Sequence, residues 1–215
     1  KGEPVAYLIN EKAFWKNVFY VDKDVLIPRP DTELLIEKIL KIYSNKSQLQ
    51  ILDIGTGSGC IILSLLKERK KDYGTGIDIS KKSINVSKIN AKLLNLSNRT
   101  KFFHSSIDNF NIGKYDLIVS NPPYIELLNL KYLEKDVVNF EPKLALNGGL
   151  DGFSKIKTVI FKASSLLKKK GKLILEIGFN QKDKVKEMLK KKGFYVNHTF
   201  QDHGNNDRCI ISTKI

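Results

Sequence analysis

Strand-like and helix-like segments alternate along this chain from residue 50 onward, and that alternation restricts the possible folds more than any other feature. Short β-branched and apolar runs predict strands at 50–54, 74–79, 101–104, 115–120 and 172–177. Amphipathic patterns predict helices at 60–69, 81–94, 153–169 and 181–192. Because strands joined through helices pair in parallel, this order indicates an α/β fold whose parallel sheet has helices on both faces.

Residues typical of helix ends support these boundaries. Ser80 precedes the second helix as an N-cap, and Gly171 and Gly193 stand where helices are expected to stop. The lysine runs 168–170 and 190–192 coincide with predicted helix C-termini, where the helix dipole favours cations.

The net charge of +14 invites a nucleic-acid interpretation. Of the 37 basic residues, however, 33 are Lys and 4 are Arg, whereas base readout and bidentate phosphate contacts rely on Arg. Asn and Ile are also abundant, which is typical of a genome-wide bias toward A and T. The charge is therefore weak evidence for an acidic partner such as a ribonucleoprotein.

Both ends of the chain depart from the alternation. The strand-like segments 194–202 and 208–215 flank a turn-rich stretch, so we expect a hairpin and an antiparallel last strand. At the other end, residues 6–27 predict a small β-hairpin packed on the main sheet. Phe14 and Trp15 within it are core residues or a lip of the substrate site.

Length and composition limit the organisation further. A chain of 215 residues suits one domain, and we expect a hairpin and connector element at 1–33 followed by the main domain at 34–215. We see no apolar run near the ~20 residues of a membrane span and no signal peptide. The chain does not open with Met, as expected for a piece of a longer protein. Cys60 and Cys209 lie far apart and away from any His cluster, so we expect no metal site and a reducing cytoplasm.

The segment "ILDIGTGSGC" (51–60) joins a predicted strand to a helix through Gly55, Gly57 and Gly59. Glycines let the backbone turn tightly and let a ligand approach without interference from a Cβ. The dinucleotide fingerprint G-x-G-x-x-G would require its third glycine at Cys60, so that match fails.

Two acids accompany this loop. Asp53 precedes it, and Asp78 ends the next predicted strand, where a carboxylate accepts both hydroxyls of a ribose. The pattern favours S-adenosylmethionine over a nicotinamide cofactor, the alternative being a tight turn followed by a chance acid. Loop residues Gly55, Thr56, Gly57, Ser58 and Gly59 would pack against the methionine half of the cofactor, with Asp53 near its ammonium directly or through water.

The loop after the following strand, 104–110, is expected to complete the cofactor site. Asp108 or Ser106 could meet the adenine amine, and Ile107 could pack against the adenine ring. The alternative for Asp108 is a solvated loop acid.

The stretch "VSNPPYI" (119–125) ends the fourth predicted strand with Asn121, Pro122, Pro123 and Tyr124. Neither proline has an N–H for a ladder, and both fix φ, so the backbone there is stiff. Two interpretations remain open from these residues alone: a rigid turn that ends the strand, or a rigid, carbonyl-rich clamp for a substrate.

Several motifs together resemble the release-factor glutamine methyltransferases, the HemK/PrmC family. They follow the family's order and span nearly the whole chain: "GEPVAYL" (2–8), "VLIPRPDTE" (25–33), "LDIGTGSG" (52–59), "VSNPPYI" (119–125), "EPKLAL" (141–146), "GGLDG" (148–152) and "DHGNNDR" (202–208). The "PRPDTE" and "GGLDG" pieces discriminate this branch, whereas "NPPY" occurs in methyltransferases of several planar nitrogens. Members usually carry a helical N-terminal domain, and this chain begins about where it would end. Ile107 stands where some members have an aromatic residue.

The resemblance implies a class I S-adenosylmethionine-dependent methyltransferase fold, Rossmann-like, with a mostly parallel seven-stranded sheet and an antiparallel last strand. It implies methylation of the glutamine side-chain nitrogen (N5) in the Gly-Gly-Gln motif of peptide-chain release factors, with S-adenosylhomocysteine as product. Asn121, Pro122, Pro123 and Tyr124 would clamp the glutamine amide, and Asn121 would also adjoin the cofactor. We expect a cytoplasmic monomer that needs no membrane and no nucleic acid.

Arg29 and Thr32, from "PRPDTE", are expected to line the substrate pocket or brace the NPPY loop. The segment is expected to form a stiff turn into a helix that Asp31 or Thr32 caps. The alternative to a role in the pocket is a purely structural entry to that helix, with Arg29 paired with Glu141 or another acid.

Two rival functions compete with glutamine methylation. An adenine-N6 or guanine-N2 nucleic-acid methyltransferase shares "NPPY" and gains from the charge, but the chain has no spare domain for base recognition. A cofactor-binding interaction module without activity would not need both a glycine loop and a clamp. A nucleic-acid enzyme would lose affinity steeply with salt.

Overall fold

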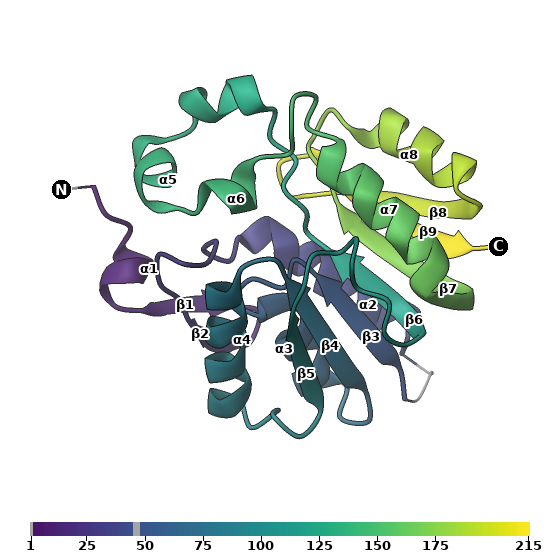
Figure 1. The fold of residues 1–215 in the computed structure, drawn as a ribbon, viewed down its shortest axis with the longest axis horizontal. Helices are drawn as coiled ribbons and strands as arrows, with labels where there is room; N and C mark the ends of the chain where they lie inside the picture. Colours follow the sequence, from purple (N-terminus) through teal and green to yellow (C-terminus); the bar gives the residue numbers. More distant parts are fainter. Residues whose placement is uncertain (1, 45–47) are drawn as a thin grey trace.

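A central seven-stranded sheet organises the molecule in the computed structural model, which describes residues 2–44 and 48–215 (Figure 1). Its strand order is β5-β4-β3-β6-β7-β9-β8. The strands are β3 (Gln50–Ile54), β4 (Tyr73–Asp78), β5 (Thr100–His104), β6 (Tyr115–Ser120), β7 (Leu167–Glu176), β8 (Phe194–Gln201) and β9 (Asp207–Lys214). Strands β3 to β7 pair in parallel, and β9 runs antiparallel to both β7 and β8. The mostly parallel sheet with an antiparallel last strand is therefore confirmed.

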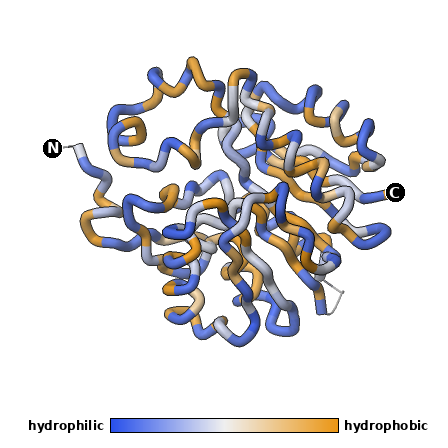
Figure 2. The backbone as a smooth tube through the Cα atoms, viewed as in Figure 1, coloured by the Kyte–Doolittle hydropathy of each residue, from blue (hydrophilic) through white to orange (hydrophobic). Residues whose placement is uncertain are grey.

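Helices cover both faces because the buried strands alternate their apolar side chains between the two sides. On one face, Ile51 and Val119 pack with helices α2 (Glu33–Ile42) and α3 (Cys60–Glu68). On the other face, Leu52 packs with α7 (Ser154–Leu166) and α8 (Lys182–Lys191). Ser80 caps helix α4 (Lys81–Leu93), since its side chain accepts a hydrogen bond from the Ser83 N–H, as predicted. Figure 2 shows the hydrophobic segments gathered in the central strands, with hydrophilic segments outside.

A separate N-terminal element precedes the sheet. It contains the unpredicted short helix α1 (Val5–Leu8) and the expected antiparallel hairpin of β1 (Glu11–Phe14) and β2 (Asn17–Tyr20). Phe14 is 1% exposed within the core, so its core assignment is confirmed, while Trp15 is partly buried and donates its indole N–H to Glu68 at 2.9 Å. Residue 1 of the expected 1–33 element lies outside the described residues.

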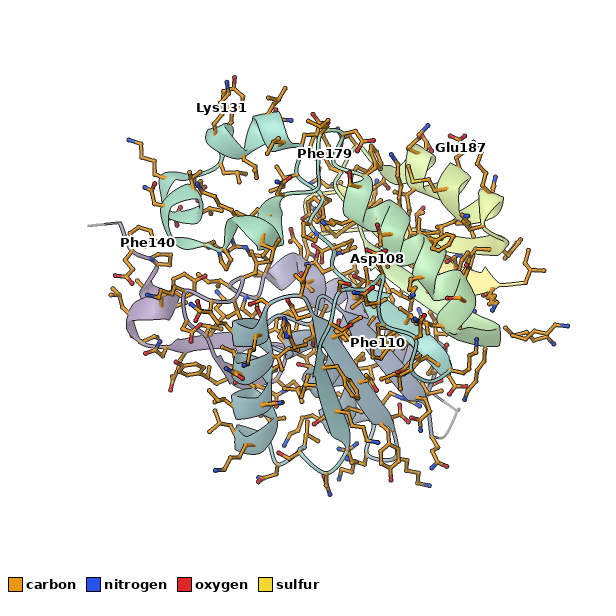
Figure 3. The ribbon with its side chains drawn as sticks, viewed as in Figure 1. Asp108, Phe110, Lys131, Phe140, Phe179 and Glu187 are labelled. Carbon is orange, nitrogen blue, oxygen red and sulfur yellow. The ribbon has the colours of Figure 1, made fainter. Side chains whose placement is uncertain are left out.

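The chain makes a second unpredicted excursion after β6. The 3-10 helix η2 (Leu127–Tyr132) and the short helices α5 (Lys135–Phe140) and α6 (Lys143–Leu146) lie together at the upper left of Figure 1, beyond the carboxyl ends of the strands. Lys131 marks the outer end of this excursion in Figure 3. No helix among the described residues has the length and apolar character that a membrane crossing requires.

The predicted end of the helix expected at 153–169 is wrong. Helix α7 stops at Leu166, and β7 begins at Leu167, which is buried and pairs with Tyr115 of β6. The lysine run 168–170 and Gly171 therefore lie in a strand instead of ending a helix. A pairing partner across the sheet outweighs the local signal for continuing the helix.

The predicted cap of α2 is right in position, because Thr32 is the N-cap residue, but it makes no capping bond. Residues 30–32 form a 3-10 turn, η1 (Pro30–Thr32), and Thr32 occupies the N-cap position without a side-chain capping bond. Its hydroxyl instead donates to the carboxylate of Glu176 at 2.7 Å. At the other end of the domain, Gly193 follows α8 with φ 77°, as expected for a helix stop.

Candidate active site

A cavity of about 240 Å³ opens at the carboxyl ends of β3, β4, β5 and β6. The sheet order reverses between β3 and β6, so chains leaving these neighbours diverge and leave a crevice between them. The sequence-predicted residues on its wall are Gly55, Gly57, Asp78, Ile107, Asn121, Pro122 and Pro123, together with Ser106 and Asp108. Four separate loops therefore bring their predicted residues to one site.

The glycine loop holds its shape through left-handed backbone. Gly57 has φ 54° and Gly59 has φ 82°, a region that favours glycine. At Gly59 an added Cβ would also lie 3.0 Å from Leu63 Cδ1 of α3, so the loop packs closely on that helix. At Gly55 and Gly57 an added Cβ would meet no atom within 4 Å, which leaves their exposed side open to a ligand.

Asp78 ties the glycine loop to the end of β4. Its Oδ2 accepts the Gly57 N–H at 3.0 Å, and its Oδ1 accepts the Ser80 N–H at 2.8 Å. Burial raises the pKa of Asp78, and these backbone donors oppose the rise. Each carboxylate oxygen retains a further lone pair, so the side chain suits a ligand with two adjacent hydroxyls.

Asp53 lies beneath the glycine loop and is not on the cavity wall. Its side chain is fully buried, and Oδ2 accepts the Thr56 hydroxyl at 2.8 Å. Oδ1 has no hydrogen-bond partner among the described residues, and burial raises the pKa of Asp53 to about 7. An unpaired buried acceptor fits an ammonium reached through water. Thr56, Ser58 and Gly59 likewise lie behind the cavity wall, where Ser58 C=O accepts the Asn90 amide at 2.9 Å.

The loop after β5 forms the third wall. Ile107 lines the cavity and packs against the apolar cluster that includes Phe110, and Figure 3 labels Asp108 and Phe110 in this loop. The Lys162 ammonium donates to the backbone C=O of Asp108 at 2.7 Å and holds the loop against α7. An apolar side chain beside polar loop groups suits a flat heterocycle such as adenine.

The NPPY segment leaves β6 with its ends anchored. Asn121 donates its side-chain N–H to Thr32 Oγ1 at 3.1 Å, while no described residue donates to its Oδ1. Tyr124 is not on the cavity wall: its hydroxyl lies 3.3 Å from both Glu176 Oε1 and Arg208 Nη1. Burial beside Glu176 raises the pKa of Tyr124 far above its ordinary value. Asn121, Pro122 and Pro123 therefore face the cavity, and Tyr124 braces them from behind.

Neither Arg29 nor Thr32 lines the cavity. Arg29 Nη2 lies 2.5 Å from Glu141 Oε1, the structural pairing that the sequence left open. Thr32 is 3% exposed and bridges Asn121 and Glu176. Direct substrate contact by either side chain remains a prediction.

Sequence reasoning missed several residues of the site. Glu176 ends β7 with 2% exposure, and Arg208 approaches Tyr124 from β9. An acid at the end of an apolar strand is the signal that singled out Asp78, and "LILE" (173–176) carries it too. The missed wall residues come from the N-terminal element, the strand ends and the residues after them, α4, the excursion after β6, and α7: Asp24, Val25, Leu26, Ile54, Ile77, Ile79, Ser80, Ser83, Ser105, Ser120, Pro142, Leu144, Ala145, Lys155, Thr158 and Val159.

The wall chemistry fits S-adenosylmethionine. Asp78 offers acceptors for ribose hydroxyls, Ile107 an apolar contact for adenine, and the open glycine loop room for the amino-acid half. Among the described wall residues Lys155 is the one basic side chain, which suits a ligand without phosphates. In the same described part of the chain no His, Cys, Asp and Glu side chains gather as a metal site, and Cys60 and Cys209 are free thiols. Fold and site together define a class I S-adenosylmethionine-dependent methyltransferase.

Comparisons with known proteins agree. A family model described as "Methyltransferase domain" matches residues 45–211. A methyltransferase from Pyrococcus furiosus shares the fold with a TM-score of 0.66 at 21% identity, over 91% of this chain and 88% of that one. A ribosomal protein L11 methylase from Lactobacillus delbrueckii superposes with a TM-score of 0.62 at 22% identity, over 86% of this chain and 79% of that one.

Sequence relatives narrow the family. A release factor glutamine methyltransferase from Buchnera aphidicola (subsp. Schizaphis graminum) is 43% identical over 99% of this chain and 76% of its own length. One from Caulobacter vibrioides is 36% identical over the whole of this chain and 74% of its own length. The chain belongs to the release factor glutamine methyltransferase family.

Proposed function

We propose that this protein transfers a methyl group from S-adenosylmethionine to the side-chain nitrogen (N5) of the glutamine in the Gly-Gly-Gln motif of peptide-chain release factors. The products are the methylated factor and S-adenosylhomocysteine. One observation carries the proposal: Asn121 is held by its N–H at the cavity wall, which leaves its amide oxygen free to receive a substrate amide. The names of the relatives support the choice of substrate.

The chemistry requires a rigid pair of acceptors. An amide nitrogen is a poor nucleophile because its lone pair is delocalised into the carbonyl. Asn121 Oδ1 and the Pro122 backbone C=O can each accept one N–H of the glutamine NH₂, which fixes the amide and raises electron density on nitrogen. Positioning of this kind supplies up to ~7–11 kcal/mol of a barrier.

The same acceptors stabilise the positive charge that develops on nitrogen. The bound cofactor supplies an electrophilic methyl group on a sulfonium. No strong general base is needed, because an N-alkylated amide cation is very acidic and releases its proton readily. Pro123 stiffens the loop, and Tyr124 anchors its far end to Glu176.

We also propose the residue division that the sequence suggested, with 1–33 as a connector to a methyltransferase domain at 34–215. Support comes from Asp24, Val25 and Leu26, which place the connector on the cavity wall. We further propose that the protein is cytoplasmic, since release factors act in translation. We also propose that it is a monomer and acts without nucleic acid.

The test is methyl transfer from labelled S-adenosylmethionine to a purified release factor. The parallel reactions contain the same factor with its Gly-Gly-Gln glutamine changed to alanine, and bulk RNA and DNA. We expect label on the unchanged factor alone. Label on nucleic acid with none on the factor would contradict the proposal and assign the clamp to a base.

A further inference from the structure

A buried relay of two hydrogen bonds joins the end of β7 to Asn121 of the NPPY segment, which forms the proposed clamp. Glu176, at the end of β7, accepts the Thr32 hydroxyl on Oε2 at 2.7 Å. Thr32 Oγ1 in turn accepts the Asn121 side-chain N–H at 3.1 Å. Thr32 and Glu176 are 3% and 2% exposed, so water does not compete for these bonds. We propose that Glu176 and Thr32 are positioning residues that set which end of the Asn121 amide faces the substrate; this inference rests on the proposed function.

The argument depends on counting protons. A threonine hydroxyl has one proton to donate, and an ionised carboxylate can only accept. With the Thr32 proton directed to Glu176, Thr32 has only lone pairs to offer to Asn121. Asn121 must therefore present its NH₂ to Thr32 and its oxygen to the cavity, which is the orientation that a substrate NH₂ requires.

The same carboxylate also holds the other end of the NPPY segment. Glu176 Oε1 lies 3.3 Å from the Tyr124 hydroxyl, which lies 3.3 Å from Arg208 Nη1. Arg208 is itself held by Asp202, with Nη2 2.9 Å from Oδ2. Thr32 and Tyr124, from segments far apart in the sequence, therefore both contact Glu176, and the carboxylate links both ends of the clamp.

The charge of Glu176 controls the direction of the relay. Burial raises the pKa of Glu176 to about 7, against the lowering effects of Thr32, Arg208 and Tyr124 and with a further rise from Asp31. Cys60 and Cys209 also lie within its electrostatic reach and are neutral, since burial raises the pKa of each thiol to about 12. Once protonated, Glu176 could donate to Thr32, whose own proton would then turn toward Asn121 and favour the reversed amide.

The experiment measures kcat for release-factor methylation between about pH 5.5 and 9, with both substrates saturating. For wild type we expect kcat to fall as the pH drops below about 7. Thr32→Val should lower kcat at high pH roughly tenfold or more and remove this acid limb. Thr32→Ser keeps the hydroxyl and should recover most of the lost rate together with the acid limb. Glu176→Gln cannot ionise and should lack the limb.

Thr100→Val is the matched control. Thr100 opens β5 at the opposite end of the sheet, where its hydroxyl bonds Leu96 C=O at 3.0 Å, so its removal should leave the kcat profile unchanged. The affinity of each variant for S-adenosylmethionine should stay at the wild-type value. A Thr32→Val profile like that of wild type, or an acid limb retained in Glu176→Gln, would overturn the proposal.

A second measurement tests the relay without turnover. The side-chain NH₂ resonances of Asn121, assigned by their loss in Asn121→Ala, should titrate near pH 7 in wild type and not in Glu176→Gln. Asn121 NH₂ resonances that do not respond to pH in the wild-type protein would contradict the relay, whatever the kinetic profiles show. Wild-type protein that leaves release factors unmethylated would refute the proposed function alone, because the NMR result stands independently.

Discussion

Replacing Arg29 with alanine should cost the protein stability more than substrate affinity. The change removes the guanidinium from Glu141, whose side chain is 1% exposed. Among the described residues, the other donor to the Glu141 carboxylate is the Ile27 N–H, which lies 3.4 Å from Oε2. Burying a carboxylate without its cation lowers the free energy of unfolding strongly. In this variant the unpaired Glu141 carboxylate would lie between the N-terminal element and the start of α6.

The size of the loss follows from the exposure of the pair. Removing one partner of a fully buried ion pair costs ~3–5 kcal/mol. The Arg29 side chain is 39% exposed, so water can partly replace it. We therefore expect a loss of about 2 kcal/mol, which corresponds to a fall in Tm of roughly 4–8 °C for a chain of this size.

Thermal unfolding of four proteins tests this estimate: wild type, Arg29→Ala, Glu141→Gln and the double variant. The double variant should be more stable than Arg29→Ala, because it leaves no unpaired carboxylate. Arg29 does not line the cavity, so the affinity of Arg29→Ala for S-adenosylmethionine should be unchanged. A Tm within about 1 °C of wild type, combined with a raised KM for the release factor, would refute this reasoning and assign Arg29 to substrate binding.

Three further outcomes are expected. Asn121→Ala should lower the methyl-transfer kcat by ~10²–10³ with little change in Tm, because it removes one clamp acceptor; near-normal turnover would eliminate the clamp. Asp78→Asn should weaken S-adenosylmethionine binding about tenfold in calorimetry, since the NH₂ that replaces one carboxylate oxygen accepts no hydrogen bond and leaves a backbone N–H or a ribose hydroxyl without its acceptor; an unchanged Kd would rule out that ribose contact. Burial raises the pKa of Asp53 from 3.8 to about 7, so its stabilising contribution is full below about pH 4 and is lost as the pH rises through 7. The Tm of Asp53→Asn should therefore rise relative to that of wild type between about pH 4 and 8, and a constant difference would contradict the shift.

The cavity shows which features of the site can be predicted from local sequence patterns. Parallel strands carry their following loops to one edge of the sheet, so strand-end residues such as Asp78 and Asn121 could be placed together from the sequence. Gly193, Ser80 and the terminal hairpin were predictable for a similar reason, because short-range backbone geometry decides them. The start of β7 was not, because Leu167 finds its partner Tyr115 about fifty residues away.

The sequence by itself determined the layered α/β architecture, the glycine loop and the chemical types that gather at the strand ends. Each of these depends on backbone geometry and side-chain periodicity within a few residues. Only the tertiary structure decided what the side chains touch: Asp53 lies beneath the loop, Arg29 pairs with Glu141, and Thr32 joins Asn121 to Glu176. The physical reason is that hydrogen bonds and ion pairs act over about 3 Å, and which groups come that close depends on packing between elements distant in the chain.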